Sequence, residues 1–218
     1  PLATDLVSAQ ALTRLAEARG VQIGCAPSTL FGETAQTLWQ ALRKGLIGEP
    51  RLVVANLDEG ASHGENIAET LINPSGAKWP AWDEYRAGCT VEHAGYVLCW
   101  LVAYFGSVRR VMNYSKLCFA DKGIPVPVEE MAPDFATAIL EFDKGITAQI
   151  NSSVVAPPNH GLCVVGEKGY LKVDHVWPFA CPVKLTYHDK PWLTESLPRV
   201  AEPVWDPKGL SKPWYYRN

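Results

Sequence analysis

The sequence has 218 residues, of which 47% are hydrophobic and 20% are charged, and its formal net charge is -3. These values are typical of a packed globular protein and exclude a disordered chain or a fibre, and the length predicts one large domain or one domain with an appendage. The Lys and Arg residues are scattered singly, so we expect neither a nucleic-acid-binding stripe nor a polybasic membrane patch.

Targeting and cysteine patterns point to the cytoplasm. The sequence contains no run of roughly 18 apolar residues, and residues 1–10 lack the charged and apolar regions of a signal peptide. The six cysteines form no Cys-x-x-Cys motif and lie mostly in apolar runs, so we expect reduced packing residues; a disulfide framework is the alternative and suits smaller secreted chains. The spacing of the five histidines predicts no metal site.

The first 27 residues carry the pattern of an αβ unit. Apolar residues at helical spacing predict a helix over residues 4–19, which Gly20 ends, and residues 21–26 form a short apolar run typical of a buried strand. A buried parallel strand needs partner strands on both sides. We therefore expect residues 1–27 to be the end of a nucleotide-binding (Rossmann) domain whose earlier part this chain lacks.

Residues 28–218 are expected to form a second, α+β domain. Helical spacing predicts helices over residues 33–44 and 91–105, and residues 58–86 show so little periodicity that we expect a long loop packed by Trp79 and Trp82. Short β-rich runs predict the strands, at residues 51–57, 108–118, 135–142, 146–154, 161–165, 170–174 and 183–187.

Tight glycine-containing turns set the expected sheet topology. Residues 143–145 and 166–169 are too short for a parallel crossover, so we expect an open, mainly antiparallel sheet with the helices on one face. Residues 146–155 are apolar on both alternating sets, which predicts a homodimer or homotetramer formed through the exposed sheet face. The Pro-rich tail of residues 191–213 is expected to be extended.

Several segments, taken in order and spacing over residues 1–187, resemble the Gfo/Idh/MocA oxidoreductases. Pro1-Leu2-Ala3 is similar to the end of that family's Glu-Lys-Pro-Leu segment, which places Pro1 at the cofactor. The Gly-Leu-Ile-Gly-Glu-Pro sequence of residues 45–50 resembles the entry into the family's C-terminal domain. Further similar segments are the helix region of residues 88–106 and the strand regions of residues 134–142, 145–153 and 165–171.

The resemblance implies a Rossmann domain followed by an open antiparallel sheet, with NAD or NADP bound between them. It also implies hydride transfer at a carbinol carbon of a sugar, inositol, nucleotide sugar or related polyol. The phosphate-binding pattern G-x-G-x-x-G does not occur in the 218 residues. We therefore expect the missing N-terminal part to bind most of the cofactor and the fragment alone to be inactive.

Hydride removal from a carbinol requires a base for the hydroxyl proton. In many relatives a Gly-x-His segment supplies it, but the corresponding residues here are Gly95-Tyr96-Val97. We predict instead that His93 and Glu92 form the catalytic pair, since the positive end of the helix dipole would depress the pKa of a first-turn histidine. The alternative is a carboxylate that stabilises the helix beside a histidine packed under the Trp79 and Trp82 loop.

Four residues are predicted to contact substrate. His160 and Asn159 follow two prolines in a rigid turn, Tyr96 lies on the helix of His93, and Trp82 is placed to stack on a sugar ring. A surface turn and ordinary packing are the alternatives for these residues. Lys122 is a weaker candidate, and we assign His63, His175 and His188 no role.

Three functions stay open at this stage. The first is an NAD(P)-dependent sugar-type dehydrogenase. The second is a non-catalytic sugar-sensing or assembly subunit with the same fold, motivated by Val97 in the histidine position. The third is an isomerase, epimerase or glycosidase that uses transient oxidation.

Overall fold

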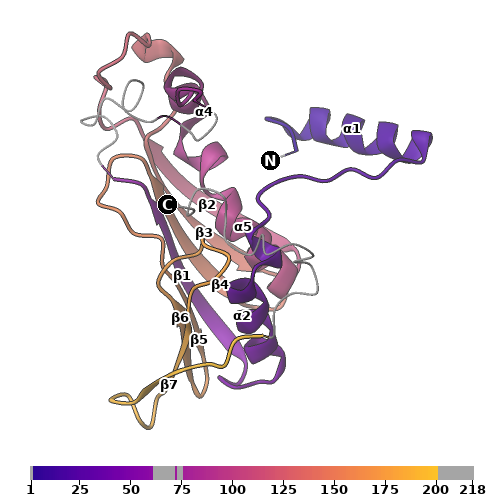
Figure 1. Ribbon diagram of the computed structural model, residues 1–218, viewed down its shortest axis with the longest axis vertical. Coiled ribbons are helices and arrows are strands. Elements are labelled where there is room, and N and C mark those ends of the chain that lie inside the picture. The colour runs from indigo at the N-terminus through magenta and orange to yellow at the C-terminus, as the bar shows by residue number, and fades with distance from the viewer. Residues whose placement is uncertain (1, 61–71, 73–75, 201–218) are drawn as a thin grey trace.

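The computed structural model describes residues 2–60, 72 and 76–200, so Pro1 and His63 lie outside the described residues. Figure 1 shows a long sheet with helices packed along one side and the N-terminal helix set apart from it. Within the described residues, no helix is both long and apolar enough to cross a bilayer.

The N-terminal helix α1 (Leu6–Arg19) confirms the predicted helix. Asp5 caps its start by accepting a hydrogen bond from the Ser8 backbone nitrogen at 2.8 Å, and Gly20 ends it with φ 62°, in the left-handed region. The predicted strand at residues 21–26 is wrong, because these residues pair with no described strand and a strand needs a hydrogen-bonded neighbour. The division into residues 1–27 and 28–218 stays a prediction.

The sheet has eight strands in the order β2-β3-β4-β1-β5-β6-β7-β8. Every neighbouring pair is antiparallel except β1 and β4, which are parallel, so the predicted open, mainly antiparallel α+β sheet is confirmed. The long stretch between β1 and β4, whose described residues include α4 (Ala81–Glu92) and α5 (Gly95–Phe105), provides the crossover that parallel pairing requires. The strands are β1 (Pro50–Asp58), β2 (Val108–Lys116), β3 (Phe135–Phe142), β4 (Thr147–Ser153), β5 (Leu162–Gly166), β6 (Gly169–Val173), β7 (Val183–Tyr187) and β8 (Thr194–Ser196).

The main core lies between the sheet and the helices α2 (Glu33–Arg43) and α5 (Gly95–Phe105). Trp100 of α5 is fully buried there, and its indole nitrogen donates a hydrogen bond to the Thr29 hydroxyl at 3.1 Å. On β2, Met112 and Tyr114 are more than half exposed. One sheet face is therefore covered by helices, as Figure 1 shows, while the edge strand opposite β8 keeps large apolar side chains in solvent.

The prediction of a loop over residues 58–86 is wrong at its end, because helix α4 (Ala81–Glu92) begins there. The predicted helix over residues 91–105 is in fact the end of α4 followed by α5, with His93 and Ala94 between them. Gly88 breaks the helical pattern inside α4 with φ 77° and ψ 164°, which hides its periodicity from a sequence window. The tail prediction missed β8, which pairs with β7.

Candidate functional site

The candidate site lies at one end of the sheet. β1 and β4 run parallel, and β6 has the same direction because β5 is antiparallel to both β1 and β6. The carboxyl ends of these three strands therefore meet at one edge, where Glu59 follows β1, His160 follows β4 and Trp177 follows β6. The junction of α4 and α5 brings His93 to the same place, at 6.0 Å between the ring centroids of His93 and Trp177.

His93 is 4% exposed and sits where α4 ends. Its backbone nitrogen donates to the Cys89 oxygen at 3.0 Å, and its backbone oxygen accepts from Tyr96 at 3.0 Å. Burial lowers the pKa of His93, while the charges of Glu59 and Glu92 oppose that shift. The expected placement in the first turn of a helix is wrong, so a lowered pKa has a different physical cause from the helix dipole.

Two carboxylates flank the imidazole of His93. Its Nε2 lies 3.8 Å from Oε1 of Glu59 and 3.8 Å from Oε1 of Glu84. The indole nitrogen of Trp79 donates a hydrogen bond to the other oxygen of Glu84. Burial raises the pKa of Glu84 to about 7, although the bond from Trp79 works against the rise. A carboxyl group in this range exchanges protons near neutral pH.

His160 joins the cluster from the segment between β4 and β5. Its Nε2 lies 3.6 Å from Oε1 of Glu59, and its ring stacks on Trp177 with centroids 4.2 Å apart. Main-chain bonds fix this segment: Asp58 and Asn159 exchange two bonds of 2.9 Å, and Val176 donates to the His160 oxygen at 3.0 Å. Main-chain hydrogen bonds at the strand ends therefore fix the backbone that carries the His160 ring.

Four buried side-chain atoms of the cluster have no hydrogen-bond partner among the described residues: Oε1 of Glu59, Nδ1 of His93, Nε2 of His160 and Nε1 of Trp177. Buried polar atoms are nearly always paired, so several unpaired atoms in one place mark a site for a ligand with hydroxyl or amide groups. Among the described residues, no group of histidine, cysteine and acidic side chains is arranged to hold a metal ion.

The other predicted site residues are distributed around this cluster. Glu92 is close enough to His93 to raise the histidine's pKa, and the Tyr96 ring packs on Trp177 at 5.3 Å. Asn159 is exposed, and its side-chain oxygen accepts from the Gly161 nitrogen at 3.2 Å, which is a turn contact. Trp82 lies in the first turn of α4 and is 39% exposed. Pro1 lies outside the described residues.

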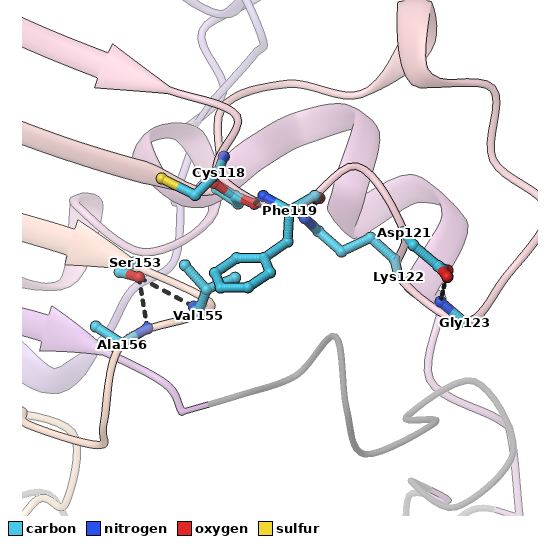
Figure 2. A network of polar contacts seen from close by, with 9 residues as sticks. Cys118, Phe119, Asp121, Lys122, Gly123, Ser153, Val155 and Ala156 are labelled. Atoms are coloured by element: carbon cyan, nitrogen blue, oxygen red, sulfur yellow. Dashed lines mark hydrogen bonds and ion pairs between the residues drawn. The ribbon is translucent and has the colours of Figure 1, made fainter.

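Lys122 is not at the site, but it helps to support α4. Its amine is buried and bonded to Asp134 at 2.5 Å and to the Phe119 oxygen. Asp134 also accepts from the backbone nitrogens of Cys118 at 2.6 Å and Phe119 at 3.0 Å. Figure 2 shows Lys122 next to Phe119, and it also shows the turn in which the Ser153 hydroxyl accepts from the backbone nitrogens of Val155 and Ala156. The loop that contains Lys122 and the turn that follows Ser153 are therefore both stabilised by internal hydrogen bonds.

Sequence reasoning missed the residues that surround His93. Glu59 and Glu84 were placed in the loop of residues 58–86, and His175 was assigned no role, although its ring lies 4.5 Å from that of His160. One available signal was the acidic pair Asp58 and Glu59 at the carboxyl end of β1, because the carboxyl ends of parallel strands often carry functional side chains. Trp177 offered no comparable signal.

Comparisons with known proteins match this architecture. Residues 35–172 match the sequence model of a family described as the GFO/IDH/MocA C-terminal domain. No curated protein matches the chain.

Three similar solved structures come from different bacteria. The NAD binding oxidoreductase from Klebsiella pneumoniae has a TM-score of 0.68 at 19% identity, over 90% of this chain and 52% of that chain. The inositol dehydrogenase homolog from Azotobacter vinelandii, complexed with NADH and myo-inositol, has 0.66 at 17%, over 90% and 48%. The aldose-aldose oxidoreductase from Caulobacter crescentus, complexed with glycerol, has 0.69 at 16%, over 93% and 55%.

These likenesses concern the fold, because the sequence identities are low. The chain spans about half the length of the solved structures that it matches.

Proposed function

The chain belongs to the GFO/IDH/MocA family, and from that premise we propose that it is the substrate-binding and oligomerisation part of an NAD(P)-dependent oxidoreductase. The proposed substrate is a sugar, nucleotide sugar or related polyol. The observation that carries the proposal is a buried histidine, His93, flanked by two carboxylates beside buried polar atoms that have no partner among residues 2–60, 72 and 76–200. The similar structures complexed with NADH and myo-inositol or with glycerol support the same substrate class.

The residues present fit the reacting end of a nicotinamide cofactor. The unpaired atoms of His160 and Trp177 match the hydrogen-bonding needs of a carboxamide or a sugar hydroxyl. The sequence contains no G-x-G-x-x-G phosphate-binding pattern, so we assign the phosphates of the cofactor to protein outside these 218 residues. The chemistry supplied by the bound cofactor is acceptance of a hydride from the carbinol carbon.

His93 is the proposed base. Because burial lowers its pKa, the imidazole is neutral at neutral pH and can accept the hydroxyl proton of the substrate. His160 and Tyr96 stand beside Trp177 and are proposed to bind and orient the substrate. Glu92 contributes negative charge near His93 rather than a direct contact, so its proposed part is electrostatic.

Activity of the complete protein tests the proposal. NAD+ or NADP+ is supplied with neutral sugars and polyols, including myo-inositol, and reduced nicotinamide is followed by absorbance. Replacement His93→Ala should lower turnover by roughly 100-fold or more, the usual contribution of a positioned base. His188→Gln is the matched control, because His188 contacts the Gly166 oxygen at the other end of the sheet and should leave turnover unchanged. Unchanged turnover in His93→Ala would show that another group is the base.

The second candidate function is a non-catalytic sugar-sensing or assembly subunit. The observation that favours it is Val97, fully buried in the core at the position where many relatives offer a histidine. The two functions are separated by adding NAD+ or NADP+ and a sugar to the complete protein and measuring reduced nicotinamide. A sensing subunit of this kind would bind the sugar without reducing either cofactor. The upstream gene sequence adds a second observation, because a G-x-G-x-x-G pattern and a Glu-Lys pair there favour the enzyme.

A further inference from the structure

One oxygen of Glu59 lies between two imidazoles. Oε1 is 3.8 Å from Nε2 of His93 and 3.6 Å from Nε2 of His160, and it is buried with no hydrogen-bond partner in the part of the chain that the structure describes. These separations exceed a hydrogen bond but close with small side-chain movements, and catalytic bonds are often long before the substrate binds. Oε1 of Glu59 is therefore placed to accept a hydrogen bond from either imidazole.

The backbone at Glu59 is fixed by the sheet. Its nitrogen donates to the Ser153 oxygen at 2.9 Å, and the preceding Asp58 exchanges two main-chain bonds with Asn159. Next to it, Gly60 has φ 108°, and a side chain at that position would meet Pro158 at 3.3 Å. A substitution at Gly60 would therefore be strained, and the Glu59 side chain itself lies on the side of His93 and His160.

The two carboxylates beside His93 differ in hydration. The side chain of Glu84 is 9% exposed and bonded to Trp79, whereas that of Glu59 is 25% exposed. Burial disfavours a charged carboxylate, so Glu84 holds a proton at higher pH than an ordinary glutamate. Glu59 is therefore the less buried of the two carboxylates, and its Oε1 lies near both imidazoles.

We propose that Glu59 is a positioning residue that aligns His93 and His160 on one carboxylate oxygen and stabilises the positive charge that His93 gains on accepting a proton. The inference rests on the proposed function and deepens it. In the oxidation, the substrate O–H bond breaks and its proton forms an N–H bond on His93, while the carbinol C–H bond breaks and hydride passes to the oxidised nicotinamide cofactor of the proposed function. A carbonyl forms, and the new imidazolium faces Glu59.

The electrostatic surroundings make the inference testable without substrate. The groups that face His93 are Glu59, Glu84, Glu92 and His160, and both Glu59 and Glu92 raise its pKa against burial. The pKa of His175 is lowered by burial and by His160, and of the described carboxylates Glu59 is the one that raises it. Glu59 therefore acts on two histidines, and Glu92 acts on one.

The experiment is an NMR titration of the imidazole resonances in the complete protein. In Glu59→Gln, the pKa values of His93 and His175 should both fall, and the ring resonances of His160 should move. In the matched variant Glu92→Gln, only the pKa of His93 should fall. A Glu59→Gln protein in which the pKa of His93 is unchanged, or which behaves like Glu92→Gln, overturns the proposal.

Two further measurements distinguish the proposed role of Glu59 from a folding defect in the Glu59→Gln variant. In the unmodified protein, the carboxyl carbon of Glu59 should respond to the titration of His93, and an insensitive resonance rejects the proposal without any variant. Glu59→Asp keeps the charge and should retain more turnover than Glu59→Gln, whose kcat should fall roughly 100-fold with little change in KM. If the expected pKa changes are observed but the protein oxidises no sugar or polyol, the positioning role of Glu59 stands and the proposed oxidoreductase function is refuted.

Discussion

Replacement of Lys122 with methionine tests whether a buried ion pair holds the loop that supports α4. The side chains of Lys122 and Asp134 are 1% and 2% exposed, and their charged atoms are 2.5 Å apart. The same loop contacts α4 directly, because Ala132 donates to the Tyr85 oxygen at 2.9 Å and Cys89 donates to the Pro133 oxygen at 3.2 Å. Loss of the amine therefore disturbs a carboxylate that water cannot readily reach.

Removal of one member of a buried ion pair costs about 3–5 kcal/mol, because the remaining charge is left without its partner. Here the carboxylate keeps the backbone nitrogens of Cys118 and Phe119, so we expect a value near the lower limit, about 3 kcal/mol. Addition of Asp134→Asn to Lys122→Met should recover part of the loss, since it removes the unbalanced charge. The exposed Lys144, changed to methionine, should alter stability by less than about 0.5 kcal/mol.

Urea unfolding followed by tryptophan fluorescence measures these differences, and its pH dependence gives a second check. Burial alone would raise the pKa of Asp134, but the bonds from Cys118, Lys122 and Phe119 outweigh it and lower the pKa below 3.8. Because the folded value is the lower one, the stabilisation is present above about pH 4 and is lost as the pH falls through the folded pKa. A Lys122→Met loss below about 1 kcal/mol at neutral pH would refute the reasoning.

Three other predictions concern α4, Glu84 and the open sheet face. Gly88→Ala should destabilise the protein by about 3 kcal/mol, more than Gly45→Ala, since a Cβ at Gly88 would lie 2.6 Å from that of Ala132 whereas Gly45 has open space. The pKa of Glu84 rises on folding to about 7, so its contribution to stability is lost as the pH rises from about 4.5 to 7. Thermal melts should therefore show Glu84→Gln gaining up to about 3 kcal/mol over the unchanged protein at pH 8 but not at pH 4. Met112→Glu should dissociate the proposed homodimer or homotetramer in sedimentation runs, and a monomer before substitution would contradict that assembly.

Much of the sheet could be predicted because residues close together in the sequence determine several of its strand pairings. β3 and β4 flank a short turn at residues 143–145, and β5 and β6 meet across residues 167–168, so alternating hydrophobicity and turn residues determine both pairings. The helix α4 could not be predicted in the same way. Gly88 interrupts its periodicity, and its buried residues pack on segments distant in sequence, Tyr85 with Val126 and Cys89 with Ala136.

The site was only partly predictable, since residue type indicates which side chains can do chemistry but not which ones meet. His93 and His160 were found because histidine titrates near neutral pH. Glu59 was not found, because its neighbours depend on the parallel pairing of β1 with β4, in which Asp58 aligns with Ser153. No local pattern specifies a pairing between residues so distant in sequence.

That one parallel pairing also explains why the acid/base groups gather where they do. It puts the residue after β1 beside the segment after β4, and the antiparallel steps through β5 bring the residues after β6 to the same edge. An entirely antiparallel arrangement of β1 with β4 would place Glu59 at the opposite end from His160. The crossover formed by α4 and α5 both permits the parallel pairing and carries Glu84 and His93. The segment that makes the topology possible therefore supplies half of the proposed catalytic cluster.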